Sequence, residues 1–428
     1  MNLKQMTLLA GAVAAVLCAF SAQAAIQGIT GPTFDLTAKS GYISTPEGGR
    51  LYILGYANGG GTVQYPGPTL IVNQGQTVTV NLTNALDTPV SMVFPGQGSV
   101  TAQAVSGATA DGLMTREAGP GGVVRYRFTA SNPGTYMYHS GTRPDIQIML
   151  GMVGALIVRP TSGGSPVADQ AYGHPATHFD QEFLFLLTEM DPNINDMVEH
   201  GRMNEVNSSD FFPVLWFLNG RCAPDTMEPD NVAWLPTQPY NCMPMMEPGE
   251  KLLMRVVGGG RDVHPFHHHG NNALIIARDG RMLATNGTSG PDRGVSVYTV
   301  QTAPGQTVDA IFEWTGEKIG WDIYGHQPGD PMEPNEYAPD HGKPFPVSMP
   351  ENQDLGFGAN WSGSPFLGAM GTLPPGQGAL NIGGSYYYMW HSHTEKEMVN
   401  NDIFPGGMMT MLMIMPPGTM MMKEASAK

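Results

Sequence analysis

The chain has 428 residues, which allows two or three domains, and its 55 glycines, 36 prolines and 14% charged residues favour turn-rich β structure over long helices. A formal net charge of −16 argues against nucleic acid or an anionic membrane surface as partner. The sequence also lacks a glycine-rich phosphate loop and a nucleophile elbow, which argues against nucleotide-dependent and serine-hydrolase chemistry.

Residues 1–24 are typical of a secretory signal. Lys4 supplies the positive start, Leu8 to Phe20 an apolar stretch, and Ala22-Gln23-Ala24 a small-residue cleavage site. The apolar stretch is too short for a membrane anchor, and bulky Leu17 disfavours lipid attachment through Cys18. We therefore expect a periplasmic or secreted protein, or one on the cell surface, without a membrane span.

Residues 26–160 show the alternating strands and short turns of a β-sandwich. Residues 161–178 are a candidate linker because they are rich in Gly, Ser, Pro and Ala. The expected strands of this first half are Arg50–Tyr56, Thr69–Val72, Thr77–Leu82, Val90–Phe94, Val123–Thr129, Gly134–His139 and Met149–Val158.

Residues 179–418 repeat this order, which predicts an internal duplication of one sandwich domain. Glu247–Val257 is similar to Asn73–Leu82. Tyr386–His393 followed by Gly407–Ile414 parallels the last two strands of the first half. A Gly/Pro-rich stretch, 325–380, interrupts the second half, and a Met-rich tail occupies 419–428.

Two cysteines remain after removal of the signal, Cys222 and Cys242. An even pair in an oxidising compartment predicts a disulfide across a Pro-rich loop. The alternative is a pair of thiolate metal ligands. It is weaker because neither cysteine lies near a histidine in the sequence.

Two histidine-rich motifs indicate a metal site. The first reads His-Pro-Phe-His-His-His-Gly at 264–270, and the second reads His-Ser-His at 391–393. Residues two apart on a strand point to the same face, so the pairs His267/His269 and His391/His393 on neighbouring strands can surround one volume. Neutral imidazole binds copper, zinc, iron or nickel. His268 has the opposite phase and should face away.

These motifs resemble those of the multicopper oxidase family. Tyr65–Asn84 is similar to the opening of the family's first domain, and 264–270 matches the pattern His-Pro-x-His-x-His-Gly. Residues 391–393 match the His-Cys-His pattern except that Ser392 replaces the cysteine. The resemblance implies tandem cupredoxin-like Greek-key β-sandwich domains, an all-β fold, with copper as cofactor.

The resemblance also implies a role for each histidine. His264 would bind the blue type 1 copper and His267 the type 2 copper, while His269, His391 and His393 would bind type 3 copper. A serine hydroxyl is a poor copper ligand, and blue copper requires a thiolate. In the first half, residues 91–97 lack the family's His-x-His pair and 139–141 keep only His139, so that domain has degenerate copper ligands.

The expected activity is oxidation of a metal ion or small reductant with dioxygen. Without the type 1 cysteine, the electrons would come directly from a metal ion or from a donor protein such as a cytochrome. The alternatives are a non-catalytic copper-binding or resistance protein, which the 29 methionines favour, and a copper-free scaffold. The resemblance further implies a homotrimer in which His139 approaches a neighbour's histidines. We expect Met409–Met415 to be a core strand rather than a copper site.

Overall fold

The computed structural model describes residues 26–314, 331, 348–349, 379–380, 385–415 and 418–419. The expected signal at 1–24, most of 325–380 and nearly all of the Met-rich tail lie outside the described residues. In the part of the chain that is described, no helix has both the length and the apolar character needed to cross a membrane.

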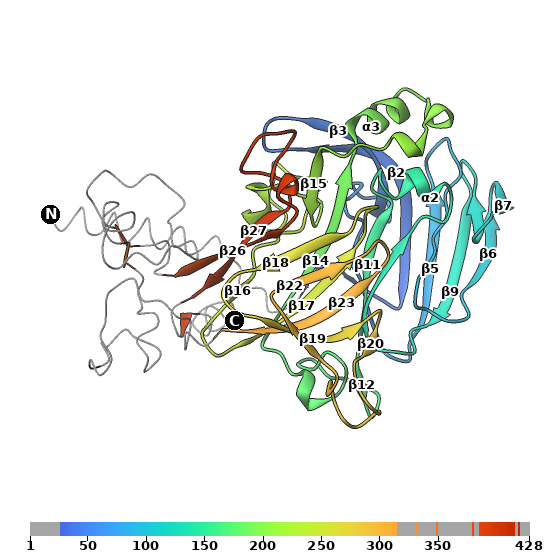
Figure 1. The fold of residues 1–428 in the computed structure, drawn as a ribbon. Helices are drawn as coiled ribbons and strands as arrows, with labels where there is room; N and C mark the ends of the chain where they lie inside the picture. Colours follow the sequence, from blue (N-terminus) through green and yellow to red (C-terminus); the bar gives the residue numbers. More distant parts are fainter. Residues whose placement is uncertain are drawn as a thin grey trace, which may run out of the picture.

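Two sheets form the first half of the chain, seen in blue to cyan in Figure 1. Apolar residues alternate with exposed ones along Thr77–Asn84, so one face of the strand enters the core between the sheets. One sheet has the order β3 (Arg50–Asn58), β2 (Thr33–Ser44), β5 (Thr77–Asn84), β9 (Val123–Thr129) and β6 (Thr101–Ser106), and the other β1 (Ile29–Thr30), β4 (Leu70–Asn73), β11 (Val153–Arg159) and β10 (Gly134–His139).

The second half also forms two main sheets around a core that contains Phe185, Phe266 and Trp390. One has the order β15 (Leu215–Leu218), β14 (Gln181–Met190), β17 (Lys251–Gly258), β23 (Thr307–Glu313), β19 (Ala273–Arg278) and β20 (Arg281–Met282), with β21 (Val295–Val297) beside β19. The other has the order β16 (Met245–Met246), β27 (Met409–Ile414), β26 (Tyr386–Ser392), β18 (His264–His268) and β22 (Thr299–Thr302).

The two halves share one pairing pattern. In the first, β3–β2 is antiparallel, β2–β5 parallel and β5–β9 antiparallel. In the second, β15–β14, β14–β17 and β17–β23 follow the same sequence of directions. The strand triplets β4–β11–β10 and β16–β27–β26 also correspond, because in each the first two strands are parallel and the last two antiparallel. The expected β-sandwich class and the internal duplication are therefore confirmed.

Short elements connect these sheets. The expected linker at 161–178 contains a small hairpin, β12 (Thr161–Ser162) with β13 (Ser165–Pro166), and the turn η1 (Pro175–Thr177). The others are β7 (Thr109–Asp111), β8 (Arg116–Ala118), α2 (Pro144–Gln147), α3 (Pro192–Glu199), η2 (Met203–Glu205), η3 (Ser208–Asp210), η4 (Asp225–Met227), η6 (Glu395–Met398) and the pair β24 (Ser348–Met349) and β25 (Ala379–Leu380).

A buried ionic network joins the two halves. Arg255, which is fully buried on β17, donates to Glu182 at 3.0 Å and to Thr135 of the first half at 3.0 Å. Glu182 also pairs with Arg159, and Thr135 donates to Asp309. Each charge in this network faces a partner of opposite sign, as a buried charge requires.

The expected disulfide is wrong. Cys222 and Cys242 are both free and buried. They belong to different apolar clusters, because Cys222 packs with Tyr65 and Phe217 whereas Cys242 packs in the main core of the second half. Cys242 donates its thiol proton to the Leu218 carbonyl at 3.0 Å. Burial raises the pKa of both thiols, so they behave as small apolar side chains.

Two strand predictions have different outcomes. Val90–Phe94 forms no strand and makes only isolated bridges from Val90 to Ala118 and from Val93 to His139. The Met-rich strand is β27, which is buried along its whole length, so its expected core position is confirmed. Met411 and Met413 of this strand lie with Met243 and Met245 in one apolar cluster.

Candidate metal centre

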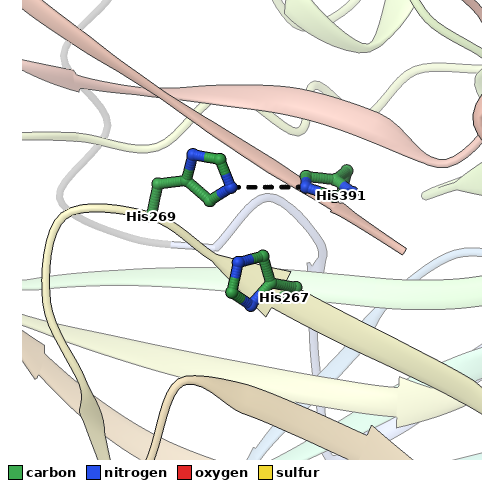
Figure 2. Close-up of side chains that lie close together, drawn as sticks. All are labelled: His267, His269 and His391. Atoms are coloured by element: carbon green, nitrogen blue, oxygen red, sulfur yellow. Dashed lines mark hydrogen bonds between the residues drawn. The ribbon is translucent and has the colours of Figure 1, made fainter. Parts of the chain in front are cut away.

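The pairing of β18 with β26 brings the two histidine motifs together. The strands are antiparallel, and His267 lies directly opposite His391. His269 follows the end of β18, where its backbone N–H donates to the Met389 carbonyl at 3.3 Å and its carbonyl accepts from the Trp390 indole at 3.0 Å. Figure 2 shows His267 on β18, His269 on the turn after it and His391 on β26, with the three rings facing one another.

Four imidazoles share this volume. The ring centroids of His267 lie 4.9 Å from those of both His269 and His393. The Nε2 atoms of His269 and His391 are 3.4 Å apart. Candidate ligand atoms of His267, His269 and His391 lie within 4.8 Å of one another. We call these four residues the histidine cluster: His267, His269, His391 and His393.

Backbone carbonyls orient two rings of the histidine cluster. His267 Nδ1 lies 2.8 Å from the Tyr298 carbonyl, and His391 Nδ1 lies 2.7 Å from the carbonyl of Ser392. Each contact requires the proton on Nδ1 and leaves Nε2 with its lone pair. That tautomer is the one a metal would use, with the carbonyl serving as the outer hydrogen-bond partner.

The electrostatic surroundings favour the neutral form of His267, His269 and His391. Burial, and then repulsion from neighbouring imidazoles, lowers the pKa of His269 to about 4. Burial also lowers the pKa of His267 and of His391. Neutral imidazole is the form that binds a metal ion, so the donor set fits copper or another imidazole-preferring metal without loss of a proton.

His268 points to the opposite side of β18, as its position in the strand predicts. It is buried against Trp390 and Phe312, with ring centroids 5.7 and 5.8 Å away. Its Nε2 accepts from the Ala273 backbone N–H at 3.1 Å. Burial lowers the pKa of His268 to about 4, so it is a neutral core residue.

His264 does not join the histidine cluster. It is fully buried, and its Nδ1 and Nε2 lie 2.9 Å from Glu397 and from Glu189 respectively. Both ring nitrogens therefore have carboxylate partners. Burial opposes the charged form, but the hydrogen bonds and charges of the two carboxylates outweigh it and raise the pKa of His264 to about 9.

Two further sequence features are placed by the structure. His139 lies at the end of β10, in a different sheet from the cluster, and its Nδ1 lies 2.8 Å from the Ser140 carbonyl. Ser392 is buried opposite Phe266, and its hydroxyl accepts from the Thr394 N–H at 3.2 Å. The serine thus closes the turn after β26.

Sequence reasoning missed the carboxylates Glu189 and Glu397. Glu189 lies 75 residues before His264 on another strand, and no motif marks it. Glu397 follows the His-Ser-His motif closely, and an acidic residue near a histidine pair is too common to single out. They are identified only by the three-dimensional fold, which brings β14, β18 and η6 together around His264.

Comparison with known proteins agrees with this fold. A sequence model described as multicopper oxidase matches residues 57–163. Copper resistance protein A of Pseudomonas syringae pv. tomato is 25% identical over 331 residues, which cover 70% of this chain and 48% of that protein. The chain thus spans about half the length of this curated relative.

Solved structures show the same fold. The blue copper oxidase from Nitrosomonas europaea aligns with a TM-score of 0.56 at 19% identity, over 89% of this chain and 85% of that one. The multicopper oxidase mgLAC aligns with a TM-score of 0.57 at 18% identity, over 90% and 86%. The sequence matches show that this chain is similar to multicopper oxidases, and the motif resemblance puts Ser392 where those proteins have the type 1 copper cysteine.

Proposed function

We propose that this protein binds one or two copper ions at the histidine cluster. The observation that carries the proposal is the convergence of four imidazoles, two of which are held by backbone carbonyls through Nδ1, so that Nε2 faces the other rings. The similarity to multicopper oxidases favours copper over zinc, iron or nickel, which imidazole also binds. Bound copper would supply one-electron redox chemistry towards dioxygen.

The residues of this chain have three tasks in that chemistry. The carbonyls of Tyr298 and Ser392 hold the Nδ1 protons and so keep the rings in one tautomer. The Trp390 indole fixes the backbone of His269. His393 is half-exposed and lies 3.0 Å from Glu395, so it is the histidine that solvent and a small reductant reach.

The activity that we propose is oxidation of a metal ion or small reductant by dioxygen, each reductant giving one electron. A blue copper site needs a thiolate and a free imidazole. Beside β18 and β26 the thiolate is replaced by Ser392, and both ring nitrogens of His264 are hydrogen-bonded to carboxylates. Electrons would therefore come from a donor protein such as a cytochrome, or directly from a metal ion. We expect slow turnover with phenolic substrates.

A non-catalytic copper-binding or resistance role is the second proposal. The similarity to a protein named for copper resistance favours it. Oxygen uptake separates the two readings. Copper-loaded protein that consumes dioxygen with ferrous ion, cuprous ion or reduced cytochrome is an oxidase. Stoichiometric copper without oxygen uptake with any of these donors supports the binding role.

Copper binding is tested by titration of the metal-free protein with a His267→Ala/His391→Ala variant beside it. His200→Ala is the matched control, because this histidine is exposed and pairs only with Asp196 on α3. We expect the control to bind like the wild type and the double variant to lose the stoichiometric copper. Equal binding by all three would refute the site.

Assembly and location are also proposals. A homotrimer would place His139 of one subunit near the histidine cluster of another. Light scattering at micromolar concentration tests this, and a monomeric mass would refute it. Periplasmic or secreted location follows from residues 1–24, and fractionation of cells expressing the full chain tests it.

A further inference from the structure

The strongest unexplained feature is a buried line of three ionisable side chains: Glu189, His264 and Glu397. The imidazole is the central member, and each of its ring nitrogens lies 2.9 Å from one carboxylate oxygen. All three side chains are 2% exposed or less. A buried charge persists only where partners surround it, so this arrangement has a structural or functional cause.

Glu189, at the end of β14, holds the segment that enters β18. Its second oxygen accepts from the backbone N–H groups of Arg261, at 2.5 Å, and Asp262, at 3.1 Å. Gly260 allows this close approach, because a Cβ there would lie 1.9 Å from a Glu189 oxygen. The carboxylate therefore fixes both the loop before β18 and the first side chain of the strand.

Glu397, on η6, holds the turn that leaves β26. Its backbone N–H donates to Thr394 at 2.8 Å, and its carbonyl accepts from Met408 at 2.7 Å. Between these points the His393 N–H donates to the Pro265 carbonyl at 2.9 Å. The hydrogen bond between Glu397 and His264 thus ties the turn that contains His393 to the first residue of β18.

In this structure carboxylates occupy both ring nitrogens of His264. The two nitrogens point in opposite directions, so a single metal ion could not replace both contacts. The remaining charged neighbours are Asp262, and Lys396, whose ammonium lies 5.6 Å from the centre of the Trp216 ring.

We propose that Glu189, His264 and Glu397 form an ionic clamp that fixes the entry of β18 and the exit of β26 without a metal and so positions the histidine cluster. The clamp cross-links these two strands, as a bound metal ion could. His264, Glu189 and Glu397 are positioning residues, since they contact no candidate ligand atom of the cluster. Only the copper readout below rests on the proposed function.

The first test is amide hydrogen exchange of the metal-free protein. Glu397→Ala should accelerate exchange at residues 391–398 by about tenfold or more, because the turn loses its attachment to β18. Glu205→Ala is the matched control, since that carboxylate is exposed and pairs with Arg202. Unchanged exchange in a folded Glu397→Ala protein would overturn the clamp.

The second test is copper affinity. Loss of a direct outer hydrogen-bond partner commonly weakens a metal site by about ten- to a hundredfold. Glu397 and Gly260 act one step further from the ligands, so we expect Glu397→Ala and Gly260→Ala to weaken copper binding by about tenfold, the lower end of that range. Wild-type affinity in both would overturn the positioning role. If the wild type itself takes up no copper, the proposed function fails, whereas the exchange experiment still decides on the clamp.

A third measurement covers a variant that does not fold. Glu397→Gln keeps an acceptor oxygen and removes the charge, so it should fold and show a smaller acceleration of exchange.

Nitrogen-15 spectra of histidine-labelled wild type should show protons on both ring nitrogens of His264 at neutral pH. A neutral His264 with one bare nitrogen would overturn the clamp.

Discussion

The ionic clamp makes the stability of the metal-free protein depend on pH in a defined window. The pKa of His264 is raised from 6.5 to about 9 in the folded state. A raised pKa means that the folded state binds the proton more tightly, so the stabilisation is complete below pH 6.5. It is lost as pH rises through about 9.

The magnitude follows from the shift. A difference of roughly 2.5 pKa units at about 1.36 kcal/mol each gives about 3 kcal/mol. His264 is fully buried, so solvent does not screen the interaction. The histidines with lowered pKa, such as His269, have finished titrating below this window. The buried thiols stay protonated in the folded state, but they ionise above about pH 8.5 in the unfolded chain and so lower the stability further at the top of the window.

Urea unfolding of the metal-free protein at pH 6.5, 8 and 9.5 measures the effect. We expect the free energy of unfolding to fall across the series by about 3 kcal/mol more in the wild type than in His264→Gln, because the contribution of the thiols is common to both. That difference is a large part of the stability of an ordinary domain. The His264 resonance, assigned by its absence in His264→Gln, should titrate in the same range. A flat stability profile with His264 titrating near 6.5 would refute the reasoning.

Three other predictions concern the frame around the site. Arg255→Met should cost about 3–5 kcal/mol in unfolding experiments, because it removes the cationic partner of buried Asp309 and leaves Glu182 with Arg159 alone, and a cost under about 1 kcal/mol would contradict the buried network. Dithiothreitol should leave the melting temperature unchanged, and thiol titration without reductant should find Cys222 and Cys242 both free. Ser392→Cys, loaded with copper, should show no intense blue absorption, because both ring nitrogens of His264 have partners; a blue band would contradict this assignment.

Much of the fold could be predicted from local patterns. The alternation along Thr77–Leu82 and Val123–Thr129 marks half-buried strands, and both are present. The spacing of His267 and His269 fixes their common side, and the pairing with His391 follows from the duplicated strand order. The strand alternation and the histidine spacing depend on residues that are near in sequence, whereas the long-range pairing with His391 could be predicted only because the strand order is duplicated.

What failed depends on contacts between distant residues. The cysteine pair suggested a disulfide, yet Cys222 and Cys242 enter different apolar clusters. His264 belongs to the same motif as His267, but Glu189 from another strand and Glu397 from the following turn occupy its nitrogens. No local pattern specifies such partners.

The most direct test of the account is copper content with electron paramagnetic resonance and optical spectra of untagged protein. The wild type should hold one or two copper ions per chain without an intense blue band. The variant with all four residues of the histidine cluster replaced by alanine should hold none. Absence of bound copper in the wild type under every loading condition, or equal copper in the variant, would contradict the central claim.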